Sequence, residues 1–229
     1  PSLTFKIMRL ANGVMFGIRN RCDPLEDAVA RVGVGKIYRI VGLATSHQAY
    51  QNDLVRYGIS AAKIWKNSVA VAALAGALAK RAGATSRVCY TAGLLRNVGR
   101  VVLDRVMSAD RSGRGESAPG LADWERQIHG CTAADVSALL LEHWRFPDSL
   151  VAMVRHHLDP LALPGAEAAP ACLLNLACGL AEELGAGLPG EARQWKQCSA
   201  MAGVLGLSDE ANDEIARTRA ALGDLRVAA

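Results

Sequence analysis

Three histidines and one arginine–asparagine pair are the side chains of this 229-residue chain that could support chemistry at a shared site. His129, His156 and His157 carry imidazoles, which can hold a divalent metal. Metal sites that hydrolyse phosphoesters also need carboxylates, because hard cations prefer anionic oxygen and the bound water must be acidified. No Asp or Glu lies beside the pair Arg96-Asn97. Two interpretations stay open: hydrogen-bonded histidines in or near the core, which the composition favours, and metal ligation.

Other catalytic patterns are weaker. Ser68 and Ser137 lack the sequence of a nucleophile elbow, and Gly33-Val34-Gly35 follows no strand pattern, so neither a serine hydrolase nor a dinucleotide fold is indicated. The six cysteines form no C-x-x-C pair and no framework spacing, and no signal peptide is expected. This cysteine usage predicts a reducing cytoplasm rather than a disulfide scaffold.

The polar pair interrupts an apolar stretch that predicts one central, buried helix from Val88 to Met107. Apolar residues recur there at three-and-four spacing, at Val88, Ala92, Leu95, Val102 and Val106. Gly93 and Gly99 are poor helix formers, so their presence predicts that other backbones pass close by. Burying the charge of Arg96 without compensation is costly. We therefore expect Arg96 either to have a partner or to line an opening.

The remaining elements also read as helices, and no segment alternates as an exposed strand would. Ser60 is the expected cap of a long helix that ends near Arg81. Thr132 with Asp135 predicts a capping box, and Asp148 the cap of the helix that holds the paired histidines. Residues 108–120 are rich in Gly, Ser and charge and predict a loop. The chain is predicted to be all-α, with about ten helices.

Composition excludes several classes of partner. The net charge of +4 and the pI of about 8.9 are mildly basic, with positive residues spread along the chain, so a nucleic-acid partner is not expected. The longest apolar run, residues 69–79, falls short of the roughly 20 residues that cross a bilayer, so no membrane partner is expected. Because the chain opens at Pro1 directly onto a helical pattern, we expect it to be a piece of a longer protein.

An ordered set of motifs resembles the HDOD domain, the output-domain relative of the HD phosphohydrolases. The set is Pro1-Ser2-Leu3-Thr4, Leu10-Ala11-Asn12, residues 25–41 (LEDAVARVGVGKIYRIV), Trp65-Lys66-Asn67-Ser68, residues 92–100 (AGLLRNVGR), His129, Trp144-Arg145-Phe146-Pro147 and His156-His157. The resemblance implies an all-α, HD-like multi-helix bundle. It implies an N-terminal helical lobe at 1–58 and a degenerate HD-like core at 59–185. Residues 186–229 carry no motif of the family and are expected to complete the domain as helices.

The resemblance also implies a vestigial site. In catalytic HD relatives a histidine, a His-Asp pair, further histidines and a late aspartate hold one or two metals. The matching positions here are Asn67, Arg96, Asn97, His129, His156, His157 and Cys178. Two like unit charges 4 Å apart repel by about 4 kcal/mol at an effective dielectric constant of 20, so Arg96 opposes a metal. Arginine also keeps its proton and cannot act as a general base. Neither a metal nor another cofactor is expected.

By the same resemblance the chain is expected to be a non-catalytic regulatory module of bacterial signal transduction, cytoplasmic and of the cyclic-di-GMP or two-component type. Its expected partner is a signalling domain, of EAL, GGDEF, receiver or kinase type, in the same or another chain. Docking and a shift between helices would transmit the signal. Two alternatives are a residual metal-dependent phosphohydrolase that uses the three histidines, and a nucleotide or anion sensor in which Arg96 and Arg100 contact the ligand.

Overall fold

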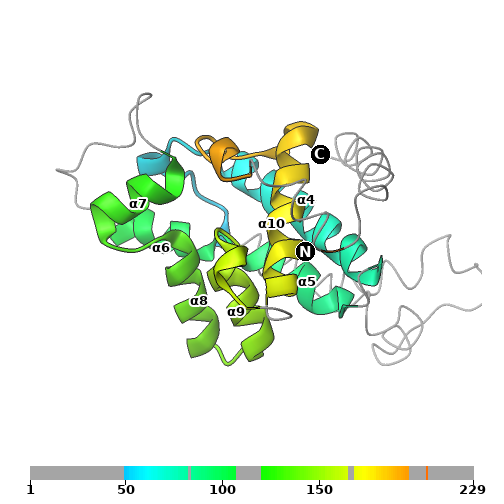
Figure 1. Ribbon diagram of the computed structural model, residues 1–229. Coiled ribbons are helices and arrows are strands. Elements are labelled where there is room, and N and C mark those ends of the chain that lie inside the picture. Colours follow the sequence, from blue (N-terminus) through cyan, green and yellow to red (C-terminus); the bar gives the residue numbers. More distant parts are fainter. Residues whose placement is uncertain (1–48, 82–83, 107–119, 165–167, 196–204, 206–229) are drawn as a thin grey trace, which may run out of the picture. The chain divides into compact units, whose positions relative to one another are not determined.

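The computed structural model describes residues 49–81, 84–106, 120–164, 168–195 and 205 (Figure 1). The chain divides into two units, Pro1–Gln48 and Ala49–Ala229, and the described residues all belong to the second. Most of the helical lobe expected at 1–58 and most of the helical segment expected at 186–229 lie outside the described residues, as does nearly all of the loop expected at 108–120.

The described residues are helical, which confirms the predicted all-α class. The elements are η2 (Val55–Tyr57), α4 (Ala61–Arg81), α5 (Ser86–Leu95), α6 (Val98–Val106), α7 (Leu121–His129), α8 (Ala133–His143), α9 (Asp148–His156), η3 (Pro160–Ala162), α10 (Ala168–Ala181), the π-helical turn η5 (Glu182–Ala186) and η6 (Ala192–Trp195). Within these ranges the β-pairing is confined to one isolated bridge between Leu54 and Ile59. None of the helices described has the length and apolar character needed to cross a bilayer.

The described core consists of two apolar clusters. In the larger one, α4 packs against α5 and α10, and α9 closes the group, as Figure 1 shows at the centre of the view. The smaller cluster joins η2 and the start of α4 to α6, α7 and the start of α8. Since α5 contributes to the first cluster and α6 to the second, the turn Arg96-Asn97 between them lies where the two clusters meet.

Helix starts follow the local sequence closely. The Ser60 carbonyl accepts the first bonds of α4, and its Oγ accepts from the Lys63 amide at 3.3 Å, as predicted for a cap. At α8 the predicted capping box is present, with Thr132 and Asp135 each accepting from the other's backbone amide. At α9 the prediction was wrong by one residue. Pro147 is the N-cap, and Asp148 is the first helical residue, where its negative charge still favours the helix dipole.

The single central helix predicted over 88–107 is instead two helices, α5 and α6. The hydroxyl of Ser137, on α8, donates to the Arg96 carbonyl at 2.7 Å and accepts from the Gly99 amide at 2.8 Å. Both groups would otherwise bond along the helix, so the inserted side chain interrupts the ladder. The Arg100 amide bonds to the Asn97 carbonyl, three residues back. The apolar periodicity continues across this break, which is why it predicted one helix.

Gly99 permits this close approach of α6 and α8. A Cβ at Gly99 would lie 2.2 Å from the Ala133 carbonyl oxygen and 2.6 Å from the Ser137 amide. We expect Gly99→Ala to destabilise the protein by about 3 kcal/mol, because the two helix backbones must separate. The matched control is Gly76→Ala in α4, whose nearest neighbour would be the Tyr90 Cβ at 3.3 Å. Urea denaturation of both variants checks this, and equal midpoints would contradict it.

Candidate functional site

Arg96 is buried and paired with a carboxylate through its two terminal nitrogens. Only 2% of the residue is exposed. Its two terminal nitrogens bind the Glu191 carboxylate in a two-pronged pair, with Nη1–Oε1 at 3.1 Å and Nη2–Oε2 at 3.0 Å. Nη2 also donates to Asn67 Oδ1, on α4, at 2.7 Å. Of the two possibilities that the sequence left for Arg96, the structure shows the first: Arg96 has a partner, 95 residues away in the sequence.

Arg100, one turn along α6, pairs with two carboxylates. Its Nη2 lies 2.6 Å from Glu191 Oε1, and its Nε donates to Glu125 Oε1, on α7, at 3.2 Å. Its Nη1 also donates to Asn97 Oδ1. The side chains of both glutamates are completely buried. Two guanidiniums therefore face two carboxylates, so the cluster is neutral as a whole, which is the arrangement that burial of charge requires.

The amides of Asn67 and Asn97 complete the cluster. Asn97 Nδ2 donates to Asn67 Oδ1 at 3.1 Å and to Ser68 Oγ at 3.2 Å. Asn67 Nδ2 donates to the Ala186 carbonyl at 2.9 Å. Glu125 Oε2 accepts from the Ala133 amide at 2.7 Å, at the N-terminus of α8. The network thus ties α4, α6, α7 and α8 to the segment that follows α10.

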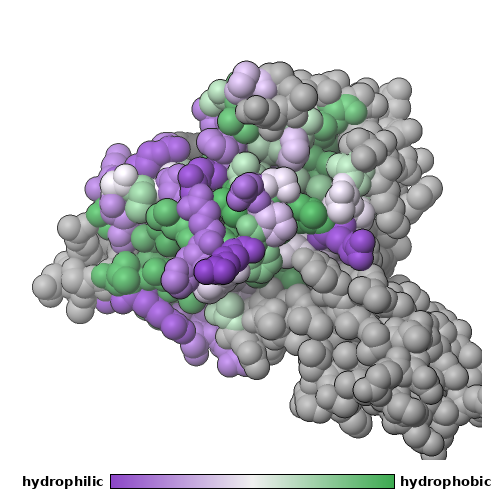
Figure 2. Space-filling view, turned by 90° about the horizontal axis from the view of Figure 1, so that it is seen from below, coloured by the Kyte–Doolittle hydropathy of each residue, from purple (hydrophilic) through white to green (hydrophobic). Residues whose placement is uncertain are grey.

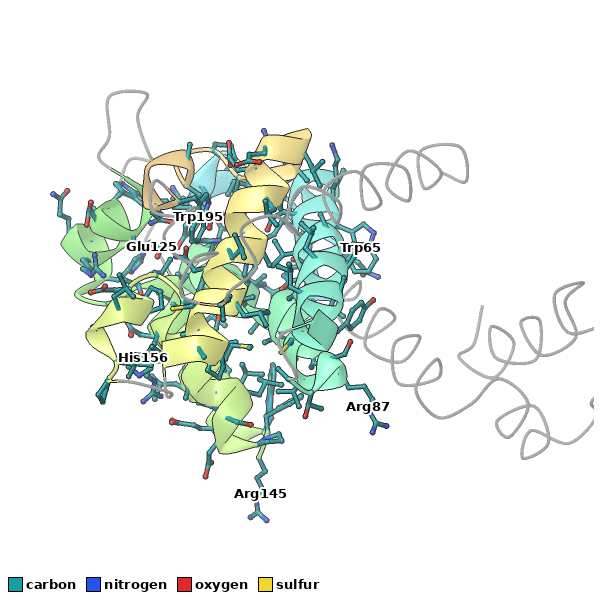
Figure 3. The ribbon with its side chains drawn as sticks, turned by 45° about the vertical axis from the view of Figure 1, so that its right-hand side comes forward. Trp65, Arg87, Glu125, Arg145, His156 and Trp195 are labelled. Atoms are coloured by element: carbon teal, nitrogen blue, oxygen red, sulfur yellow. The ribbon has the colours of Figure 1, made fainter. Side chains whose placement is uncertain are left out.

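Residues 186–195, which we call the strap, cover this network. Besides the Asn67 bond to Ala186, the Gly190 carbonyl accepts from the Leu121 amide at 3.0 Å, at the start of α7. Trp195 ends the strap with its ring over Arg96, the guanidinium carbon lying 5.8 Å from the ring centroid. Figure 3 shows the labelled side chains of Glu125 and Trp195 on the same side of the bundle. The strap therefore supplies both a counter-ion and an aromatic cover to the two arginines.

The electrostatics of the cluster favour its ionised form. Burial alone would raise the pKa of the Glu191 carboxyl, but Arg100 and Arg96 outweigh burial and lower that pKa to about 2. Burial likewise acts to lower the pKa of Arg100, and the carboxylates of Glu191 and Glu125 raise it above its usual range. Both partners are therefore charged at neutral pH, and the pair is an ion pair rather than a neutral hydrogen bond.

His157 lies at the edge of this cluster. Its ring stacks on Trp195, with centroids 6.1 Å apart and an interplanar angle of 25°. Nδ1 lies 2.6 Å from the Val154 carbonyl, which assigns the proton to Nδ1 and leaves Nε2 as an acceptor. Burial first, and then the positive charge of Arg96, lower the pKa of His157 to about 3. The imidazole is therefore neutral at physiological pH.

The structure gathers some of the predicted vestigial positions and separates others. Asn67, Arg96 and Asn97 are mutually bonded, and His157 joins them through Trp195. Cys178, on α10, is buried and close enough to Arg96 to affect its pKa. His129 instead packs edge-on against Trp124 at the end of α7. Partly buried His156 ends α9 and lies apart from Glu125 and Trp195 in Figure 3.

The donor set does not fit a metal. No group of three or more His, Cys, Asp or Glu side chains in the described ranges could hold a metal ion. The two carboxylates of the cluster already accept from Arg96 and Arg100. A divalent cation placed between them would meet two permanent positive charges. The anion that Arg96 and Arg100 contact is Glu191 of the same chain.

Three residues of the site were missed by sequence reasoning: Glu125, Glu191 and Trp195. Ser137 was considered only as a possible nucleophile. The requirement that a buried arginine has a partner pointed to an acidic residue, but gave no position for it. Glu125 and Glu191 stand 25 and 95 residues from the arginines that they bind, without a spacing that marks them. Glu191 and Trp195 also lie in the region beyond the recognised motifs.

Solved structures of other proteins share this arrangement of helices. An HDOD domain protein of unknown function from Geobacter sulfurreducens superposes with a TM-score of 0.66 at 21% identity, over 97% of this chain and 82% of that one. A protein from Marinobacter aquaeolei VT8 that is named for signal transduction superposes with a TM-score of 0.71 at 26% identity. That comparison covers 98% of this chain and 52% of the other.

The sequence comparisons agree with the structural ones. An uncharacterized protein of Treponema pallidum (strain Nichols) is 23% identical over 164 residues, which are 68% of this chain and 31% of that protein. The present chain thus spans about a third of the length of this relative. The sequence model of the HDOD domain matches residues 1–160, which is more than half of the chain. The chain belongs to the HDOD domain family.

Proposed function

We propose that this chain is a non-catalytic regulatory module of a larger bacterial signalling protein. The observation that carries the proposal is the buried ion-pair network of Arg96, Arg100, Glu125 and Glu191. By the resemblance given above, Arg96 matches a position that holds metal in catalytic HD relatives. A hydrolytic site needs a metal-bound water or another base. Here two guanidiniums that keep their protons occupy the centre, and the nearby carboxylates are paired with them.

The proposed mode of action is protein–protein or interdomain contact. The Marinobacter aquaeolei relative named for signal transduction supports it, as does the exposure of large apolar side chains. The exposed set among the described residues is Val55, Val106, Leu139, Trp144 and Leu161. Figure 2 shows apolar side chains gathered on one face and bordered by polar ones. Such surfaces suit a domain that a neighbour covers.

The proposed partner is a signalling domain of EAL, GGDEF, receiver or kinase type, in the same chain or another. The proposed setting is the bacterial cytoplasm, in cyclic-di-GMP or two-component signalling. Because the helices around the network are joined by buried ion pairs, a displacement of one of them would be transmitted to the others. Co-purification of the full-length protein with tagged domains of each type identifies which one binds.

The absence of catalysis is tested by measuring thermal stability and phosphodiesterase turnover with Mn²⁺, Mg²⁺ and Zn²⁺. We expect neither a metal-dependent rise in Tm nor turnover of a model phosphodiester or of cyclic-di-GMP. Arg96→His combined with Asn97→Asp restores the His-Asp pair and serves as the comparison. Metal stabilisation of the unchanged protein, together with turnover that EDTA abolishes, would contradict the proposal and favour a residual phosphohydrolase.

A further inference from the structure

Two side chains of the strap occupy the vestigial site in the way that a small aromatic anion would. The Glu191 carboxylate is held by Arg96 and Arg100 at 2.6–3.1 Å. Trp195, four residues on, lies across the Arg96 guanidinium and stacks on the His157 ring. One guanidinium thus contacts both an anion and an aromatic ring. This is the pair of groups that a nucleotide presents, as phosphate and base.

The anionic half of the site has more donor capacity than the strap uses. Both Glu191 oxygens are taken by terminal nitrogens of the arginines, whereas Arg96 Nε is buried and has no hydrogen-bond partner among the described residues. A phosphate has a third oxygen that could accept from it. Without Glu191, the two arginines would face Glu125 alone, so the remaining charge would be +1 by simple count. The site beneath the strap therefore favours an anion.

The aromatic half of the site, formed by Trp195 and His157, also has polar ring atoms that are not hydrogen-bonded to the described residues. Within the part of the chain that the structure describes, Trp195 Nε1 and His157 Nε2, on the two stacked rings, are buried and have no hydrogen-bond partner. Stacking tolerates exchange of one ring for another because every base has a π-face. A nucleobase differs from indole in carrying both donors and acceptors at its edge. It could keep the stacking on His157 and also use the acceptor at Nε2.

We propose that Glu191 and Trp195 are an internal ligand mimic, and that the site beneath them takes a nucleotide when the strap moves aside. The phosphate would bind Arg96 and Arg100, and the base would stack on His157. The inference rests on the proposed non-catalytic function, since the nucleotide is bound and not hydrolysed. In the intact protein the strap competes with the nucleotide, so the apparent affinity falls in proportion to the fraction of open molecules.

The test is calorimetric titration of the full chain with adenosine monophosphate, in EDTA, for the unchanged protein and Trp195→Ala. We expect binding to be about tenfold tighter in Trp195→Ala, because the stacking and cation–π contacts that the nucleotide must displace are worth about that factor. Trp195→Phe keeps a ring over Arg96 and should bind as weakly as the unchanged protein. Trp144→Ala, at an exposed tryptophan, is the matched control and should also be unchanged.

Adenosine and inorganic phosphate, titrated separately, test the aromatic half and the anionic half of the site one at a time. Each should bind Trp195→Ala more weakly than the nucleotide does. Equal binding of adenosine and the nucleotide would reduce the effect to cavity filling and overturn the proposal, as would equal affinities of Trp195→Ala and the unchanged protein. If Trp195→Ala does not fold alone, the nucleotide should restore its helical circular dichroism and adenosine should not. Restoration by neither ligand overturns the proposal.

Chromatography of the recovered nucleotide separates this inference from the proposed non-catalytic function. Hydrolysis of the nucleotide would refute the non-catalytic function, whereas absent binding would refute this inference only.

Discussion

Glu191→Ala is expected to lower the free energy of unfolding by about 3–5 kcal/mol, because it leaves two buried guanidiniums with one carboxylate between them. Loss of one member of a buried ion pair costs more than the pair contributes, since the partner charge stays desolvated. Domains commonly have about 5–15 kcal/mol of total stability, so the expected loss is a large share of it. Chemical denaturation followed by circular dichroism measures the change.

Glu183→Ala is the matched control for Glu191→Ala. Glu183 lies in the π-helical turn η5 and is exposed, so its loss should change the free energy of unfolding by at most about 0.5 kcal/mol. If both variants were equally stable, Glu191 would not be the counter-ion of the arginines, and the network described above would not hold the domain together.

Acidification is expected to destabilise the protein already below pH 6.5, through His157. The pKa of this imidazole falls from 6.5 in the unfolded chain to about 3 in the folded one, so the unfolded state binds the extra proton first. Stability is therefore fully present above pH 6.5 and is lost as the pH falls toward 3. Each pH unit below 6.5 costs about 1.4 kcal/mol of the free energy of unfolding, so about 3 kcal/mol is lost over the two units down to pH 4.5.

Neighbouring charged and polar groups also affect the pKa of His157, in addition to burial. The groups that act on its ring are Arg96 and Arg100, which lower its pKa, and Glu191 and the Val154 carbonyl, which raise it. Glu191 has its own window: its pKa falls from 4.5 to about 2, so its contribution is present above pH 4.5 and is lost below it. Between pH 6.5 and 4.5 the loss should therefore come from His157 among the described residues whose pKa is shifted. Burial raises the pKa of Glu182, so its protonation in the same range acts in the opposite direction.

Denaturation midpoints at several pH values test this assignment. His157→Asn, whose amide can still donate to the Val154 carbonyl, should lose the slope between pH 6.5 and 4.5 and keep the loss below pH 4.5. His156→Gln, at the partly buried neighbour, controls for removal of an imidazole. A slope that persists in His157→Asn and disappears in His156→Gln would show that the other histidine titrates.

The parts of the fold that were predictable from sequence are those that short-range physics determines. The cap at Ser60, the capping box at Thr132 and the long helix to Arg81 each depend on residues within one or two turns. The division of the central helix at Arg96-Asn97 depends on Ser137, 38 and 41 residues further on. The spacing of apolar residues along a helix depends only on residues close in sequence. It therefore predicted one continuous helix and could not indicate the break that Ser137 causes.

The candidate site was predictable in one respect. A charged residue in an apolar stretch required a partner or an opening, and Arg96 has a partner. The identity of that partner was not predictable, because Glu191 lies in a segment without periodicity or a family motif. The positions of His129 and His156 show the reverse difficulty. Their order in the sequence matched the family, yet His129 packs against Trp124, and His156 lies apart from Glu125 and Trp195 in Figure 3.

The most direct test of the central claim is anomalous X-ray diffraction from crystals of the full chain grown with Mn²⁺. We expect no anomalous peak between Arg96, Arg100 and Glu191, and density for the two-pronged pair of Arg96 with Glu191. A manganese peak at this place, with Arg96 turned aside and Glu191 bound to the metal, would show that an ion rather than a guanidinium is the counter-charge and would contradict the account.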